Sequence, residues 1–472
     1  MALVVESKKA CAVNPLKMSQ PLGATYAFLG LDSCMPLMHG SQGCTSFGLV
    51  VMVRHFREAI PMQTTAMNEV TTILGGMENI EQALLNIQKR NHPRIIAICS
   101  TGLTETKGDD VDGYLELIRK RHPELDDTAL VYVSTPDYVG AFEDGFSRAV
   151  SALVKALVEP SAVRSPNQIN LLAGCHLTAG DIEELREMFT SFGLDAIVLP
   201  DVSGSLDGHI PDDWLGTTLG GTTLESIRAM GASALTIAVG EQMRSAAMEL
   251  EMCAGVPYVL FDRLTGLEPS DRLLQTLSEF TGLPVPTRYR RQRSQLLDAM
   301  LDGHFFFGNV KLAIAAEPDL LWSMGSFLAE MGAELTVCVT TTRSPLLSRL
   351  PTNEVVISDL EDFERAAQAA GCDLLLTHSH GRQAAARLNK PLYRIGMPLF
   401  DRLGNAHIVS VGYRGTRNLV FDIGNLLIAQ TPHHQPDHWP LQPASLAAAA
   451  PSAALATASA CSKSGSSCGC SS

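Results

Sequence analysis

The sequence predicts an α/β fold of parallel sheets flanked by helices. Short apolar runs, each bounded by polar or turn residues, alternate with longer amphipathic stretches along most of the 472 residues. This alternation is typical of strands that are buried between two layers of helices. The length is enough for about three domains at roughly 150 residues each, and the 46% of hydrophobic residues can fill several large cores.

Strands are expected wherever a short apolar run precedes an amphipathic stretch. In the amphipathic stretch Asp181–Phe192, for example, Ile182, Leu185, Met188 and Phe189 fall on one helical face. The segment around Cys34 (Leu-Asp-Ser-Cys-Met-Pro-Leu) is interpreted as a core segment without assignment to a strand. The expected strands, in chain order, are Arg94–Ser100, Ala129–Ser134, Ile169–Ala173, Ala196–Pro200, Ala234–Val239, Pro257–Phe261, Leu312–Ala315, Glu334–Thr340, Val355–Ile357, Leu374–Thr377 and Leu392–Ile395.

Two polar stretches divide this pattern into three Rossmann-like domains. Glu159–Gln168 has the composition of a linker, and the basic stretch Arg288–Arg293 marks a second boundary. Because ligands bind beyond the carboxyl ends of parallel strands, three such domains facing one another would enclose a deep cavity. The predicted organisation is a first domain at 1–160, a second at 166–290, a third at 294–430, and a disordered Ala/Ser/Cys-containing tail at 431–472.

Charge and cysteine usage limit the function classes. A net charge of −14 argues against nucleic-acid binding, which needs clustered Lys and Arg. The eleven cysteines lie mostly in apolar surroundings, as Cys99, Cys338 and Cys372 do, so we expect reduced thiols and no disulfide framework. No secretory signal precedes the charged residues 6–9, and no stretch is apolar enough to span a membrane. A cytoplasmic location is therefore expected.

Cys44 is the candidate metal ligand. Residues 39–44 read His-Gly-Ser-Gln-Gly-Cys, so two glycines crowd one thiol in a turn between apolar stretches. A thiolate in such a turn suits a soft metal or an iron–sulfur cluster, although a structural thiol at the start of a helix is the alternative. One cysteine cannot fill a four-ligand site. The other ligands would come from Cys11, from Cys34 or from another chain, and a cluster shared across a subunit interface is the economical solution.

Other polar motifs carry weaker predictions. The loop Asp201–His209 either lines a cavity or, as we favour, forms a surface turn held by Asx and Ser hydrogen bonds. His378 and His380 are expected to be hydrogen-bonded loop residues more than metal ligands. The tail histidines (His433, His434, His438) are expected to be solvated, and the tail cysteines (Cys461, Cys468, Cys470) either capture metal transiently or have no ligand.

No motif for stand-alone catalysis is legible. There is no Walker A loop and no dinucleotide fingerprint with a downstream acid. The paired acids Asp109–Asp110 and Asp212–Asp213 lie in polar stretches without a nucleophile–base arrangement, so a solvated face is expected for them. No catalytic residue is assigned.

A series of short motifs, in order, resembles the nitrogenase component 1 family over residues 14–430. No single match is specific, but the order and spacing together are. The motifs are Lys17–Gly23, His39–Cys44, Arg54–Arg57 (Arg-His-Phe-Arg), Gln63–Met67, Pro200–His209, Gly220–Thr223, Glu317–Asp319, Arg394–Pro398 and Gly412–Gly415.

The resemblance implies a smaller cluster than the one in nitrogenase β subunits. Those subunits place three cysteines on an eight-iron cluster, and this chain has Ser19 and Gly102 at two of the three positions. Cys44 remains, and would join three cysteines of a homologous partner subunit on an intersubunit [4Fe–4S] cluster.

The resemblance also implies a role in cofactor assembly. The chain would be the β-type subunit of an α2β2 scaffold on which the iron–molybdenum cofactor precursor, held transiently and mainly by the partner, gains molybdenum and homocitrate. A separate nucleotide-hydrolysing reductase would dock transiently. The alternatives are a redox-active β subunit of a nitrogenase or protochlorophyllide-reductase-type enzyme, and a structural paralogue without metal.

Overall fold

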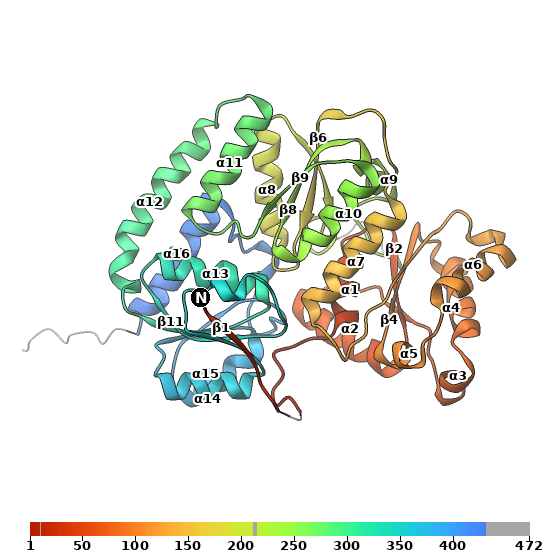
Figure 1. The fold of residues 1–472 in the computed structure, drawn as a ribbon, viewed down its shortest axis with the longest axis horizontal. Coiled ribbons are helices and arrows are strands. Elements are labelled where there is room, and N and C mark those ends of the chain that lie inside the picture. The colour runs from red at the N-terminus through yellow and green to blue at the C-terminus, as the bar shows by residue number, and fades with distance from the viewer. Residues whose placement is uncertain (10, 211–214, 431–472) are drawn as a thin grey trace, which may run out of the picture. The chain divides into compact units, whose positions relative to one another are not determined.

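The computed structural model describes residues 1–9, 11–210 and 215–430, and these form three parallel sheets covered by helices (Figure 1). The predicted α/β class is confirmed. The first sheet has the strand order β3-β2-β4-β5, the second β7-β6-β8-β9, and the third β1-β12-β11-β10-β13-β14. The predicted tail lies outside the described residues.

All eleven expected strands are present, most within one residue of the predicted ends. They are β4 (Ile95–Ser100), β5 (Ala129–Val133), β6 (Ser165–Ala173), β7 (Asp195–Leu199), β8 (Ser233–Val239), β9 (Tyr258–Phe261), β10 (Lys311–Ala315), β11 (Glu334–Thr340), β12 (Glu354–Ile357), β13 (Leu374–Thr377) and β14 (Leu392–Arg394).

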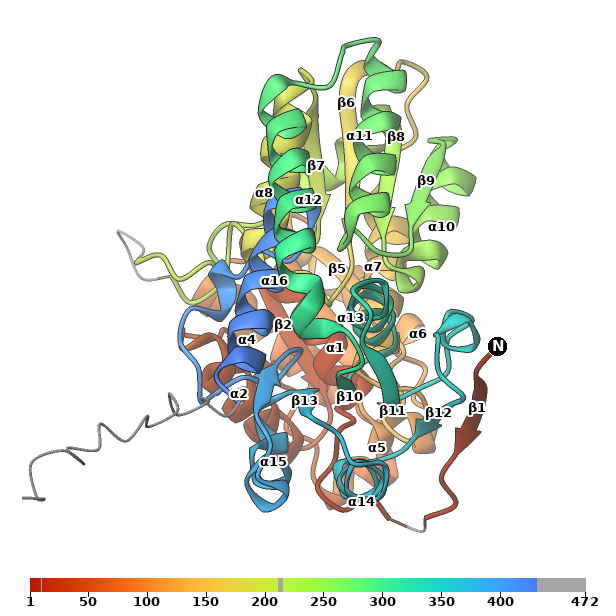
Figure 2. The ribbon, with the colours of Figure 1, turned by 90° about the vertical axis from the view of Figure 1, so that its left-hand side faces the viewer.

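Three strands were not predicted. They are β1 (Leu3–Glu6), β2 (Cys34–His39) and β3 (Gln63–Thr64). Strand β1 pairs in parallel with β12, so the first residues of the chain complete the edge of the third sheet (Figure 2). Strand β2 is buried along its whole length between β3 and β4, and leads directly to the Cys44 turn.

Helices cover both faces of the sheets. On the first sheet, α4 and α6 bury Ile80, Leu84 and Ile118 on one face, while α1 and α7 belong to the main core on the other. The longer helices are α1 (Gln20–Leu29), α2 (Gln42–Phe56), α4 (Met77–Asn91), α6 (Val111–Arg121), α7 (Phe142–Leu157), α8 (Ala179–Ser191), α10 (Arg244–Ala254), α11 (Leu267–Thr281), α12 (Thr287–Phe307), α13 (Pro318–Glu330), α14 (Leu360–Ala370) and α16 (Gly412–Ile428); the shorter ones are α3 (Glu69–Leu74), α5 (Gly102–Lys107), α9 (Leu224–Ala229) and α15 (Arg382–Leu388).

Helix α1 is buried at all ten of its positions and packs closely on α7. Glycines permit this approach. A Cβ on Gly23 would lie 1.9 Å from the carbonyl oxygen of Phe142, and one on Gly145 would lie 2.0 Å from that of Gln20. Helix α7 in turn packs against α10, so it joins the layers of the first two sheets.

The two stretches that suggested domain boundaries belong in part to regular structure. Residues 165–168 open strand β6, and Arg288–Arg293 lies inside α12, which packs against α16 at the end of the described chain. The division into three domains stays a prediction. The direction of the strands positions the candidate sites. A loop with polar side chains follows the carboxyl end of each of four strands, β2, β6, β10 and β14.

Candidate metal centre and interior cavity

Cys44 lies in the first turn of α2 and its side chain is exposed. Ser41, the N-cap residue, donates a hydrogen bond from Oγ to the Cys44 sulfur over 3.4 Å. The two glycines of the turn differ in role. A Cβ on Gly40 would lie 2.3 Å from Thr101 Oγ1, whereas around Gly43 the nearest atom, Ser41 Oγ, is 3.9 Å away. The turn therefore presents the thiol, with open space beside it.

A buried polar shell fixes the backbone just before this turn. The His39 carbonyl oxygen accepts hydrogen bonds from Thr101 Oγ1 (3.0 Å) and Thr104 Oγ1 (3.2 Å). The buried His39 ring contacts Thr65 Oγ1 through Nδ1 (3.0 Å) and Asp109 through Nε2 (3.3 Å). Asp109 is almost fully buried, so the expectation of a solvated face was wrong for it; its oxygens pair with Lys107 and face His39.

Cys44 lines a cavity of about 350 Å³ that reaches from the first sheet to the third. Phe47 and Thr101 line it on the Cys44 side, and His378 and His380 on the other. The structure thus brings the candidate His-x-His loop into the same cavity as Cys44. His378 is a buried, hydrogen-bonded residue, as expected: its Nδ1 accepts from the His380 N–H (3.3 Å), its Nε2 faces the Leu16 carbonyl oxygen (3.4 Å), and burial lowers its pKa to about 4.

Within residues 1–9, 11–210 and 215–430, Cys44 is the only thiol on this cavity. Ser19 also lines it, and the space beside Gly102 is taken by Asp137, whose Oδ1 lies 2.0 Å from where a Cβ would be. Cys34 is buried at the opposite end of β2, and burial raises the pKa of its thiol. Cys11 is exposed and does not line the cavity. These positions fit a site to which this chain brings a single thiolate.

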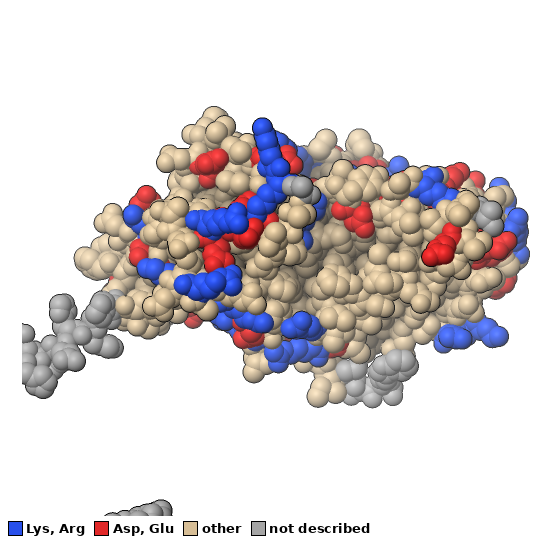
Figure 3. All heavy atoms as spheres, turned by 90° about the horizontal axis from the view of Figure 1, so that it is seen from below, with Lys and Arg blue, Asp and Glu red and all other residues tan. Residues whose placement is uncertain are grey.

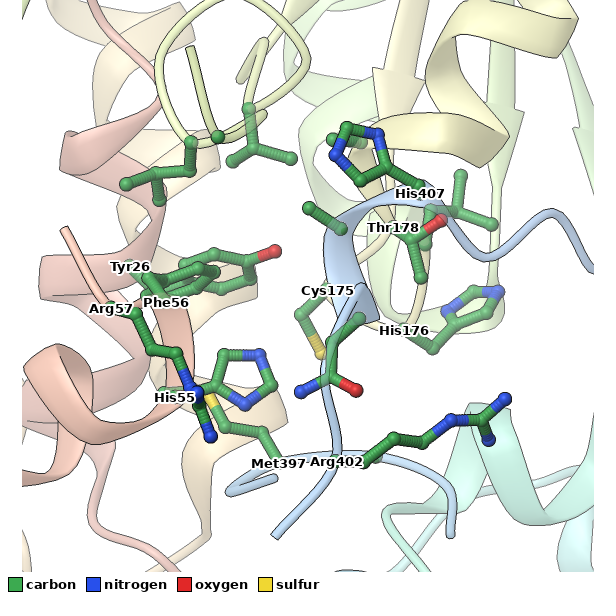
Figure 4. Close-up of a pocket in the computed structure, with 18 of the residues that line it drawn as sticks. Tyr26, His55, Phe56, Arg57, Cys175, His176, Thr178, Met397, Arg402 and His407 are labelled. Carbon is green, nitrogen blue, oxygen red and sulfur yellow. The ribbon is translucent and has the colours of Figure 1, made fainter. Parts of the chain in front are cut away.

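A second cavity, of about 210 Å³, lies where loops from all three sheets meet (Figure 4). Helices α1 and α2 contribute Tyr26 and His55 to its lining. The loop after β6 contributes Cys175 and His176. The loops after β14 contribute Met397, Arg402 and His407. His55 Nδ1 accepts from the Leu399 N–H (2.8 Å), and burial lowers the pKa of both His55 and His176 to about 4. The imidazoles are therefore neutral at pH 7.

The described residues of the second cavity do not include a preformed trio of metal ligands. Burial and neighbouring carboxyls raise the pKa of Cys175 well above its usual range. Among the described residues, the one trio of His, Cys or acidic side chains whose ligand atoms lie within 4.8 Å of one another is Asp359, Glu361 and Asp362, and the Lys9 ammonium occupies that trio. The cavity residues had no local signal in the sequence, because isolated histidines in apolar segments are usually core residues.

The Asp201–His209 loop combines both of its predicted roles. Asp201 Oδ1 accepts hydrogen bonds from the N–H and Oγ of Ser203, as in an Asx turn. Val202, Leu206 and Gly208 nevertheless line the second cavity. The loop is a turn held by local hydrogen bonds whose apolar side chains close a cavity.

Comparison with known proteins places the fold and the turn in a family. Residues 19–428 match the nitrogenase component 1 type oxidoreductases. A solved structure titled "Nitrogenase Cp1 at pH 6.5" superposes with a TM-score of 0.86 at 32% identity, covering 91% of this chain and 96% of that one. The chain belongs to the nitrogenase component 1 family.

Two relatives show which members of this family the chain is similar to. A protein of Bradyrhizobium diazoefficiens is 58% identical over 449 residues, covering 94% of this chain and 96% of its own length. One of Nostoc sp. PCC 7120 is 53% identical over 428 residues, covering 91% and 96%. Both are named nitrogenase iron-molybdenum cofactor biosynthesis protein NifN. The predicted likeness to NifN is confirmed.

Among the described residues, no helix is long and apolar enough to cross a membrane.

Proposed function

We propose that this chain is the β-type subunit of a NifE–NifN-type scaffold for assembly of the iron–molybdenum cofactor. The names of its relatives support the assembly role, since proteins 58% and 53% identical over most of the chain are named for cofactor biosynthesis. The partner would be a NifE-like subunit in an α2β2 heterotetramer in the cytoplasm. A NifH-like reductase would dock transiently, and the cofactor precursor would be cargo of the complex.

Cys44 is proposed as one ligand of a [4Fe–4S] cluster shared with that partner. One observation carries this part: an exposed thiol, held by Ser41, faces a cavity on which no second thiol of the described chain lies. A cluster bound there would supply one-electron chemistry. The protein's own contribution is to orient the sulfur through the fixed His39–Ser41 backbone and to hydrogen-bond it.

The composition of the cavity favours this assignment over the redox-enzyme alternative. A nitrogenase-type eight-iron cluster would need further thiolates, but Ser19 and Gly102 occupy those positions and Asp137 fills the space beside Gly102. Four iron atoms with one ligand from this chain agree with the residues present.

The test is cluster nuclearity. The chain is co-purified with its partner without oxygen, and iron per heterodimer is measured together with paramagnetic resonance before and after reduction. We expect the signals of a four-iron cluster at the interface. An eight-iron centre, or substrate reduction as efficient as that of a true nitrogenase, would favour the redox-active β subunit and overturn the scaffold.

A further inference from the structure

Helix α2 carries an uncovered apolar face that begins at Cys44. Phe47 is 69% exposed, Val50 53% and Val53 39%. These positions are spaced three residues apart, so each side chain adjoins the one before it on the helix surface, and the row begins beside Cys44. Phe47 and Val51 also line the Cys44 cavity. Contiguous exposed apolar side chains of this kind are typical of a surface that another protein covers.

The apolar face ends at three arginines gathered around Phe400, which we call the arginine cluster: Arg54, Arg57 and Arg382. The guanidinium carbons of Arg54 and Arg382 lie 4.3 and 4.8 Å from the centroid of the Phe400 ring. Arg57 Nη2 donates to the Phe400 carbonyl oxygen over 3.2 Å. Phe400 also packs against His380, ring centroids 5.2 Å apart, which links the cluster to the Cys44 cavity.

The arginine cluster has no carboxylate partner in the described part of the chain. Within residues 1–9, 11–210 and 215–430, no ion pair within 4.0 Å involves any of its three members. Neighbouring arginines differ, since Arg394 pairs with Asp401 at 2.8 Å. This is unexpected in a chain with a net charge of −14, in which acids outnumber bases. Burial lowers the pKa of His380, and the positive charges of Arg382 and Arg54 lower it further. Figure 3 shows the molecule from below, with lysine and arginine side chains spread among acidic ones on that face.

We infer that the arginine cluster and the apolar face of α2 together bind an acidic segment of the partner subunit. This rests on the proposed function, because it takes the occupant to be the subunit that shares the Cys44 cluster. Arg54 and Arg382 are held over the Phe400 ring, and among the described residues their N–H groups have no hydrogen-bond partner. Guanidinium groups bind carboxylates with paired hydrogen bonds. A protein segment fits better than a free anion because apolar side chains adjoin the charges.

The helix gives this segment a definite position. Cys44 and Arg54 are ten residues apart on α2, which corresponds to about 15 Å along the axis at 1.5 Å per residue. The bound acidic side chains would thus lie toward the end of α2 that is farther from Cys44. Asp137 is an acidic residue that also lines the Cys44 cavity. It fills the space beside Gly102 and forms no ion pair with the arginine cluster.

The test uses the co-purified complex of the full chain and its partner. Arg54→Glu/Arg382→Glu is compared with Arg290→Glu/Arg417→Glu, which makes the same charge change at arginines bonded to Thr287 and Gln295. Dissociation on dilution is followed by mass photometry at low and high salt. We expect the first pair to raise the dissociation constant by roughly tenfold or more and to reduce its salt dependence, and the control pair to change neither.

Folding is checked by thermal unfolding monitored by circular dichroism. If the Glu pair unfolds, Arg54→Gln/Arg382→Gln is used, with a smaller effect expected in the same direction. Unchanged assembly and salt dependence, with normal iron content, would contradict the proposed docking of an acidic segment. The proposal that Cys44 binds a [4Fe–4S] cluster would be unaffected. Normal assembly with weaker binding of the reductase would assign the arginine cluster to that transient partner, which also overturns this inference.

Discussion

Ser41 donates a hydrogen bond to the Cys44 sulfur, with an Oγ–Sγ distance of 3.4 Å. Ser41 is the N-cap residue of α2, but its hydroxyl bonds no backbone amide of the helix. The hydroxyl is therefore directed to the sulfur and not used to cap the helix, so the effect of removing it can be assigned to the metal centre and not to helix stability.

Ser41→Ala is expected to keep the iron and to lower the reduction potential of the cluster. A hydrogen bond to a ligating sulfur stabilises the extra negative charge of the reduced state, and its loss moves the potential in the negative direction. The measurement is a redox titration followed by paramagnetic resonance. Ser46→Ala, at another exposed position of α2, is the control. Equal potentials in the two variants would show that the hydroxyl does not act on the cluster.

Asp319→Asn is expected to reduce the pH dependence of stability. Burial raises the pKa of Asp319 to about 7, and also raises the pKa of Glu143, whose Oε2 accepts from the Asp319 N–H over 3.1 Å. The folded state then binds more protons than the unfolded state between about pH 4 and pH 7, so the free energy of unfolding falls as the pH rises through this window.

At pH 8 the Asn variant should be more stable than the parent by roughly 2–4 kcal/mol, and the two should converge near pH 4. Denaturant unfolding across this range measures it. Asp298→Asn, at an exposed position on α12, is the control. Parallel pH profiles of the parent and Asp319→Asn would refute a protonated buried carboxyl at this position.

Gly145→Ala is expected to destabilise the chain by about 3 kcal/mol or more. The added methyl would lie 2.0 Å from the Gln20 carbonyl oxygen, and a backbone atom of a buried helix cannot move aside cheaply. Gly424→Ala in α16 is the matched control, because its nearest neighbour, Phe307, would be 3.6 Å away. The control should be neutral or up to about 1 kcal/mol more stable, since alanine favours helix. Similar unfolding free energies for both variants would mean that the α1–α7 contact is looser than described.

The strands that local pattern alone could find were found. Each expected strand is a short apolar run followed by a helix, so the residues of the strand themselves predict that it is buried. Strand β2 was missed because Pro36 and two methionines weaken its strand signal, although it is fully buried. Strand β1 was missed because its partner, β12, is contributed by residues 354–357, and such a distant pairing leaves no local trace.

The residues of the candidate site likewise differ in whether the local sequence can identify them. Cys44 could be singled out as a candidate because Gly40 and Gly43 precede the thiol closely in the sequence. That His380 shares its cavity depends on how the first and third sheets face each other, and no spacing encodes this. Asp109 was misjudged for the same reason: a polar neighbourhood in sequence predicted solvent, but His39 and Lys107 enclose it.

The central claim is that Cys44 binds iron together with a partner subunit. The most direct measurement is iron per heterodimer, with the paramagnetic resonance spectrum, in co-purified Cys44→Ala and in Cys11→Ala, a control at another exposed cysteine. Loss or weakening of the four-iron signal in Cys44→Ala alone, with the heterodimer still assembled, is the predicted result. The same iron content and spectrum in both variants would contradict the account.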